Sequence, residues 1–277
     1  MALTLTEIFA DKIDERFKKA SLSDAAVNQD YSFVGAKTVK VTSVPTVEMG
    51  DYTRTGLSRF GVPTELENAI QELTLTKDRS FSFTLDKMNA DETKVAAAEA
   101  LARQLRERVV PEVDTYRFKQ MALKVPAANF KKETITKTTA YEAVTVGTAK
   151  LDDAEVADNR VLLASPSFLG FLKNNGDYVK ATELAQDRIL FKGQVGEIDG
   201  MPVISVPQSR LGASVNFIIA HPSVVVAPVK LAEYRVHQDP PGISGQLVEG
   251  RVYYDAFVLD QKANGLYVSS AADQPLA

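Results

Sequence analysis

The stretch SFTLDKMNADETKVAAAEALARQLRERVVPEVDTYRF, residues 82–118, decides the fold because a strand pattern passes within a few residues into a long helix. Phe83 and Leu85 alternate with polar residues, as in a half-buried strand. Strong helix formers then continue to residue 122. At the α-helical rise, a helix over 91–122 would be about 45–50 Å long. The sequence therefore predicts a structural spine that approaches the span of a whole domain.

The expected spine helix carries an apolar stripe and one interruption. The stripe comprises Val95, Ala98, Ala102, Leu105 and Val109, and it resumes at Val113, Tyr116 and Phe118. Pro111 lacks a backbone N–H, so we expect it to kink the helix or to start a second segment. Because the stripe is rich in alanine and has no sustained heptads, a coiled coil is disfavoured.

Two alternating segments precede the spine, at 37–44 and 71–86. Residues 48–63 between them hold three glycines, two arginines and two aromatic residues, a composition typical of a loop tip. The pattern predicts a long β-hairpin with a large tip. A two-stranded ribbon is marginal alone in water, so it would lie against something, such as a neighbouring subunit.

Residues 136–227 predict a compact α/β domain. Thr139 with Glu142 forms a candidate capping box. A buried strand at 160–164 leads to a helix with Ser165 as N-cap, and a hairpin turn is expected at Asp199-Gly200.

Three alternating strands follow, LAEYRVHQ, RVYYDAFVLD and GLYVSS, the last two predicted to be joined at Asn264-Gly265. Pairing of these strands with the strand before the spine would make the central domain an insertion in a second domain.

The N-terminal segment reads as a short amphipathic arm. Thr4 and Glu7 form a candidate capping box, and an apolar stripe follows at Ile8, Phe9, Ile13 and Phe17. Two interpretations stay open at this point: an arm that reaches a neighbour, and a helix that docks on its own domain.

Composition narrows the function. The 277 residues carry a net charge of −4, which argues against a dominant nucleic-acid-binding surface. Cysteine is absent, so disulfides and thiolate chemistry are impossible. No apolar run is long enough to span a bilayer.

The search for chemistry predicts no catalytic, cofactor-binding or metal site. There is no phosphate loop, dinucleotide fingerprint or nucleophile elbow. The two histidines, His221 and His237, have no local partners for a relay, and a capping or surface role suits His221 better. Asp152-Asp153 reads as a solvated face or a helix start. Arg54, Arg59 and Arg79 fit either a solvated loop or docking to an acidic patch on a neighbour.

The ordered segments resemble the major capsid proteins of tailed bacteriophages, which have the Hong Kong 97-type fold. The resemblance covers nearly the whole chain and rests on YSFVGAKTVKV, GDYTRTG, LTKDRSFSFTLDKMNADET, VVPEVDTYRF, GQVGEIDGMPVISVP and APVKLAEYRV…GRVYYDAFVLDQKANGLYV. It implies an α+β fold with an N-terminal arm (1–34), an extended loop (35–88), a peripheral domain (89–135 and 228–277) with spine helix 91–122, and an axial domain (136–227).

The resemblance also implies a function, which is structural and not enzymatic. Pentamers and hexamers would form an icosahedral shell, the virion capsid, around double-stranded DNA held without sequence-specific binding. Assembly would take place in the bacterial host cytoplasm with no membrane, and a portal would be a partner. Because no long scaffolding segment precedes the arm, we expect either a separate scaffolding protein as a further partner or a processed chain. Candidate inter-subunit contacts are Phe9, Phe17, Tyr52, Arg54, Arg59, Phe60 and Arg79.

Three alternatives remain at this point. An encapsulin-like compartment or a gene-transfer particle would share the fold. A soluble α/β enzyme of unknown reaction would belong to another class. A tail or baseplate protein would form rings or tubes in place of closed shells.

Overall fold

The structure is a computed structural model that describes residues 21–31, 38–43, 46–47, 49–55, 59–61, 65, 69–87, 97–175 and 194–274. The chain divides into two units, Phe33–Leu75 and a larger unit made of Met1–Ser32 with Thr76–Ala277. The two units are described separately below. The predicted arm helix, including Phe9 and Phe17, lies outside the described residues, as does segment 91–96 of the predicted spine.

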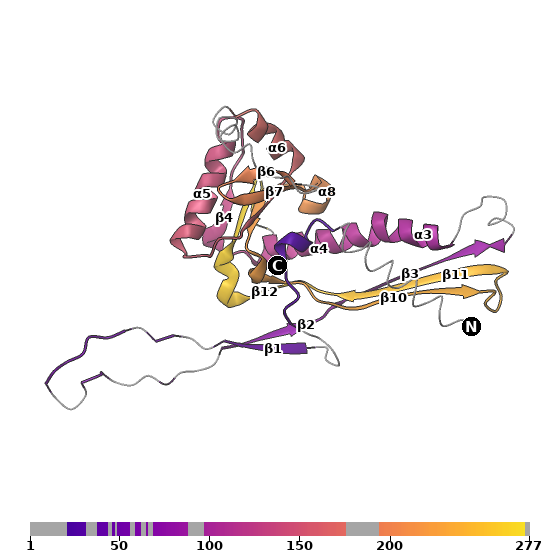
Figure 1. Ribbon diagram of the computed structural model, residues 1–277, viewed down its shortest axis with the longest axis horizontal. Helices are drawn as coiled ribbons and strands as arrows, with labels where there is room; N and C mark the ends of the chain where they lie inside the picture. The colour runs from indigo at the N-terminus through magenta and orange to yellow at the C-terminus, as the bar shows by residue number, and fades with distance from the viewer. Residues whose placement is uncertain are drawn as a thin grey trace. The chain divides into compact units, whose positions relative to one another are not determined.

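A six-stranded mixed sheet forms one half of the larger unit (Figure 1). Its strand order is β4 (Phe130–Lys132), β13 (Leu266–Ser270), β8 (Val215–Ala220), β5 (Val161–Ala164), β7 (Met201–Ser205) and β6 (Gln194–Ile198). The β4–β13 and β5–β7 pairs are parallel, and the other pairs are antiparallel. Every residue of β5 is buried, as expected for a central strand covered on both faces.

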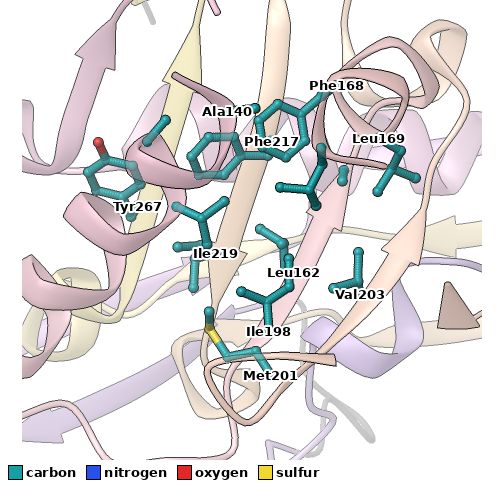
Figure 2. Close-up of a cluster of buried hydrophobic side chains, with 14 of the residues drawn as sticks. Ala140, Leu162, Phe168, Leu169, Ile198, Met201, Val203, Phe217, Ile219 and Tyr267 are labelled. Carbon is teal, nitrogen blue, oxygen red and sulfur yellow. The ribbon is translucent and has the colours of Figure 1, made fainter. Parts of the chain in front are cut away.

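Helices α5 (Ala140–Asp153) and α6 (Pro166–Lys173) cover one face of this sheet. Figure 2 shows the core beneath them, where Phe217 of β8 lies between Phe168 and Tyr267, with ring centroids 4.8 and 6.0 Å away. The predicted cap of α6 is confirmed, because the Ser165 hydroxyl accepts a hydrogen bond from the Phe168 N–H. The predicted turn at Asp199-Gly200 joins β6 and β7, and both residues have positive φ.

The opposite face of the sheet packs on α4 (Val110–Lys124) and α8 (Gln208–Leu211). Phe118 and Met121 of α4 share this core with Leu163 and Ile218, whose strand neighbours Leu162 and Ile219 face α5. Because neighbouring strand residues point to opposite faces, α5 and α4 lie on opposite sides of the same sheet.

The other half of the larger unit is a three-stranded antiparallel sheet in the order β10 (Val229–Gln238), β11 (Gly245–Tyr254) and β3 (Lys77–Asp86). Phe81, Phe83 and Leu85 alternate along β3 and pack in a core with Leu101 of the spine helix. Pairing of β3 with β11 confirms that the C-terminal strands join the strand that leads into the spine.

The spine is helical throughout its described part, as α3 (Ala97–Gln104), a π-helical turn η2 (Leu105–Val109) and α4. The Val110 N–H bonds to the Leu105 carbonyl, five residues back, so the helix widens just before Pro111 and a second segment begins at Val110.

In the first half of the helix, most of the buried residues differ from those of the predicted apolar stripe. The buried apolar residues are Ala97, Leu101, Leu105, Val110 and Val113, whereas Ala98 and Ala102 are only partly buried. The five-residue step from Leu105 to Val110 spans the π-helical turn, and a straight-helix pattern does not anticipate that step.

Short elements complete the larger unit. They are η1 (Asp24–Ala26), η3 (Ala127–Asn129), η4 (Pro222–Val224), β9 (Val225–Val226), β12 (Phe257–Val258) and η5 (Asp260–Gly265). Strands β9 and β12 pair with each other. The predicted hairpin at Asn264-Gly265 is wrong: these residues end η5, and β13 then joins the six-stranded sheet beside β8. Two strands of that sheet, β4 and β13, therefore come from outside residues 136–227.

The smaller unit contains an antiparallel pair, β1 (Thr38–Ser43) with β2 (Ala69–Thr74), in register from Thr38↔Thr74 to Ser43↔Ala69. The predicted hairpin is thus confirmed over these strands but not over β3, whose partner is β11. The predicted capping box before α5 is also absent: the helix begins after Thr139, whose hydroxyl accepts from the Thr136 N–H and not from the first helical turn.

Candidate inter-subunit surfaces

Four of the predicted contact residues lie in the connection between β1 and β2. The Thr53 N–H donates to the Arg59 carbonyl at 3.0 Å, and the rings of Tyr52 and Phe60 meet edge to face at 5.0 Å. Phe60 is 91% exposed and Met49 is 99% exposed. Tyr52 and Phe60, which are in contact and exposed, form an apolar patch of the kind that is typical of surfaces that bind another protein.

Arg54 lies in this same connection and is exposed, whereas Arg79 belongs to the larger unit. The Arg79 guanidinium pairs with the Glu112 carboxylate at 2.7 Å, so it ties β3 to the spine helix. The structure thus brings Tyr52, Phe60 and Arg59 together within the smaller unit. Their role as contacts between subunits remains a prediction.

The root of the arm, defined here as residues 21–24, is held by a buried carboxylate on the spine helix. Asp114 is 0% exposed. One carboxylate oxygen accepts from the Ser21 and Ser23 hydroxyls, each at 2.7 Å. The other accepts from the Leu22 N–H at 3.0 Å and from Arg210 at 3.1 Å. A buried charge with this many donors is stable in the folded protein, and it fixes the arm root to α4.

A second buried charge completes this arm-root network. Arg117, 1% exposed, donates from one terminal nitrogen to the Ser23 hydroxyl at 2.8 Å and to Asp24 at 2.7 Å. Asn28 then bonds through its backbone to Val225 and Ala227, each at 2.9 Å. The last part of the arm is therefore held to the rest of the larger unit from Ser21 to Asn28.

The root of the extended loop, Thr76, is held in the same manner. Asp255, 3% exposed, accepts from the Thr76 N–H at 2.7 Å and from the Thr76 hydroxyl at 2.8 Å. Its other oxygen accepts from the Tyr116 hydroxyl at 2.7 Å. Thr76 is the residue at which the larger unit resumes after the smaller one. Asp114, Tyr116 and Arg117, within one turn of α4, thus hold the roots of both extensions.

Tyr116 of α4 and Tyr254 of β11 remain protonated well above neutral pH. Burial, together with the hydrogen bond to the Asp255 carboxylate, raises the pKa of Tyr116 far above its usual range. Burial and the nearby Glu112 charge raise the pKa of Tyr254 to about 12. Tyr116 therefore stays a hydrogen-bond donor to Asp255 at all physiological pH values.

Sequence reasoning missed Asp114, Arg117 and Asp255, because single charged residues in amphipathic elements usually face solvent. A signal was present in the helix pattern. Asp114 and Arg117 are three residues apart and lie between the apolar positions Val113 and Phe118, which places them on the buried side.

The histidines have structural contacts. His221 caps η4, since its Nδ1 accepts from the Ser223 N–H at 3.2 Å, as the sequence suggested, and His237 lies 3.3 Å from Glu249. Among the described residues, no group of three or more side chains is placed to hold a metal ion, and none of the described helices has the length and apolarity needed to cross a membrane.

Solved structures with a similar fold include those of several bacteriophages. A structure from Mycobacterium phage Che8 superposes with a TM-score of 0.69 and 14% identity, over 91% of this chain and 90% of that chain. The capsid of cyanophage P-SCSP1u gives 0.68 and 11% identity, over 91% and 88%. The mature capsid of bacteriophage PhiM1 gives 0.64 and 14% identity, over 92% and 88%. No family model and no curated protein matches the sequence.

The fold is therefore that of phage capsid subunits, the α+β Hong Kong 97-type fold. The predicted fold class is confirmed over nearly the whole length of the chain.

Proposed function

We propose that this chain is the major capsid protein of a tailed bacteriophage, and that its copies assemble as pentamers and hexamers into a closed icosahedral shell around packaged double-stranded DNA. The observation that carries the proposal is the fold match to phage capsids over about nine tenths of both chains. A fold alone does not fix a function. Here the proposal is also supported by an extended hairpin unit with exposed apolar residues, a form suited to contacts with neighbours.

The named parts follow from this proposal. Residues 1–34 would be the arm, 35–88 the extended loop, 89–135 with 228–277 the peripheral domain, and 136–227 the axial domain. The six-stranded sheet would be the centre of the axial domain, with β4 and β13 added from its flanks. The spine helix shares a hydrophobic core with each of the two sheets, so it would join them into one rigid capsid subunit.

The arm and the loop would act as straps to neighbouring subunits. Their roots are fastened to one turn of α4 through Asp114 and Asp255, so the straps start from fixed positions. Contacts that are weak singly become strong when they repeat over a closed symmetric lattice. Tyr52, Arg54, Arg59 and Phe60 at the loop tip, and Phe9 and Phe17 of the arm, would be the contacting residues.

The role is structural, without a catalytic site, and the location is the virion capsid, assembled in the host cytoplasm. The partners would be other copies of the chain, a scaffolding protein, a portal and DNA held without sequence readout.

Sedimentation velocity of the purified chain, with electron microscopy of any fast fraction, tests the proposal. Closed megadalton particles are expected. A slow species that is cleaved readily within residues 49–55 would still fit a capsid subunit awaiting its scaffold. A compact monomer that resists cleavage at the tip would contradict the proposal. Particles that hold a protein cargo without DNA would indicate an encapsulin-like shell.

A further inference from the structure

A groove lined mainly by basic residues runs along the spine helix of the larger unit, between α4, the start of β3 and α8. Its volume is about 760 Å³. The cations that line it are Lys77, Arg79, Arg108, Lys119 and Arg210, and the carboxylates are Glu107 and Glu112. We call this surface the basic groove. It carries three more positive than negative side chains, in a chain whose net charge is −4.

Part of this charge is already matched within the subunit. Arg79 pairs with Glu112 at 2.7 Å, and Arg210 pairs with the buried Asp114 at 3.1 Å. Arg108 and Lys119 are exposed and make no ion pair with any residue that the structure describes. Lys77 is also exposed and makes no ion pair with the described residues; its ammonium lies 5.2 Å from the centroid of the Tyr116 ring. The unmatched charge of the basic groove therefore rests on Lys77, Arg108 and Lys119.

The π-helical turn helps to build the groove. Arg108 lies in η2, and Glu112, Thr115 and Lys119 follow it at helical spacing along the same wall. Such turns insert one extra residue and are frequent at functional sites. Without that residue, Arg108 would occupy a different angular position relative to Lys119.

A surface of opposite charge lies at the end of α5. Asp152, Asp158 and Asp199 line a hollow of about 510 Å³ together with Arg160. Asp153 and Glu155 continue the same end of the helix and are exposed. Arg160 is buried and pairs with Asp152 at 2.6 Å, so the other carboxylates keep their negative charge unmatched among the described residues. We call this surface the acidic face.

The basic groove and the acidic face cannot meet within one subunit. Helix α5 packs on one side of the six-stranded sheet, and α4 and α8 pack on the other. A contact between the two surfaces must therefore join one copy to another. Because the two surfaces differ, the contact is heterologous, and a chain of such contacts closes into a ring when the rotation permits.

We propose that the acidic face of one subunit docks into the basic groove of the next, as a head-to-tail contact within each ring of the shell. This inference rests on the proposed shell function and names the surfaces that would form the ring. The occupant is a second copy of this chain, because every copy presents both surfaces at the same local concentration.

The test is a charge swap in the full-length chain. The groove variant is Arg108→Glu with Lys119→Glu, and the face variant is Asp153→Lys with Asp158→Lys. These four side chains are exposed and make no ion pair with the described residues, so each variant should fold. Asp152 and Asp199 are left unchanged, since Asp152 holds Arg160 and Asp199 has a φ of 49° in its turn. The control reverses two exposed lysines elsewhere, Lys173→Glu with Lys262→Glu.

Each double reversal should lower the yield of closed particles about tenfold or more, because like charges would meet across the contact. The combined four-residue swap should restore the yield, and the lysine control should match the wild type. Normal particle yield in the groove variant would overturn the inference, and so would failure of the combined swap to restore assembly. Groove-variant shells that form normally but hold less DNA would identify DNA as the occupant and also overturn it.

A cross-linking measurement tests the same contact independently of whether the charge-reversal variants fold. The chain has no cysteine, so introduced pairs are unambiguous. In purified particles, Lys119→Cys with Asp158→Cys should give covalent multimers with a short bismaleimide, while Lys173→Cys with Asp158→Cys should stay monomeric. Monomers from the first pair would overturn the docking proposal. Absence of particles from the wild-type chain, together with resistance to cleavage within residues 49–55, would instead refute the shell function, so the two failures are distinguishable.

Discussion

Replacing Asp114 by alanine should loosen the arm root and destabilise the subunit. The carboxylate is fully buried and accepts four hydrogen bonds, from Ser21, Leu22, Ser23 and Arg210. Removing one member of a buried charged cluster typically costs about 3–5 kcal/mol, because the partners are left without acceptors. Part of this loss is offset, since the serine hydroxyls can rotate and Arg210 is partly exposed.

For a chain of this size we expect the melting temperature of Asp114→Ala to fall by roughly 6–10 °C. The matched control is Asp153→Ala, which removes an exposed carboxylate from the last turn of α5 and should change stability by no more than about 0.5 kcal/mol. The assays are thermal unfolding of dissociated subunits and limited proteolysis of residues 21–27, which should be cleaved faster in the variant. A melting temperature and cleavage rate equal to those of the control would refute the assignment of Asp114 as the fastening of the arm root.

Three further predictions concern the sheets and the loop root. Gly250→Ala should lower the free energy of unfolding by about 1–3 kcal/mol, because the added Cβ would collide with the Phe81 ring, and urea titration measures this. Tyr267→Phe should raise it by about 1 kcal/mol at pH 7, since the buried hydroxyl has no hydrogen-bond partner among the described residues. Burial raises the pKa of Tyr267 to about 12, so deprotonation is harder in the folded chain than in the unfolded chain. The free energy of unfolding of the wild type should therefore be unaffected by this group below pH 10 and should fall as the pH rises from 10 to 12. The phenylalanine variant should show a smaller fall over that range, and an equal fall would contradict this. Asp255→Asn should speed amide exchange at Thr76, measured by hydrogen exchange, and an unchanged rate would argue against Asp255 as the loop anchor.

Some signals carried by a few adjacent residues predicted the structure well, whereas the Thr139 capping box and the Asn264-Gly265 hairpin did not form. The Ser165 cap and the Asp199-Gly200 turn formed where expected, because each depends only on local backbone geometry. The spine helix was also predictable, since a long run of strong helix formers has no competing structure.

Features that depend on distant partners were predicted less well. Strand β13 alternates in a way that suits either sheet, and only its packing beside β8 selects the six-stranded one. The predicted apolar stripe of the spine helix was wrong in its first half. The π-helical turn at Leu105–Val109 rotates the residues before it about the helix axis relative to those after it, so one regular spacing does not fit both halves.

The residues of the candidate surfaces were likewise partly predictable from the sequence and partly not. Exposed aromatic residues at the loop tip could be recognised from composition, and Tyr52 and Phe60 do lie together. The partners of Asp114 and Asp255 could not be recognised, because Ser21–Ser23 and Thr76 are far from them in the sequence.

The central claim is that copies of this chain form closed shells, and electron microscopy of particles assembled from the full-length protein tests it most directly. The proposal predicts spherical particles of uniform diameter whose averaged images have icosahedral symmetry, with rings of five and six subunits. Open tubes or stacked rings would contradict it, and so would folded monomers that stay dispersed and resist cleavage within residues 49–55.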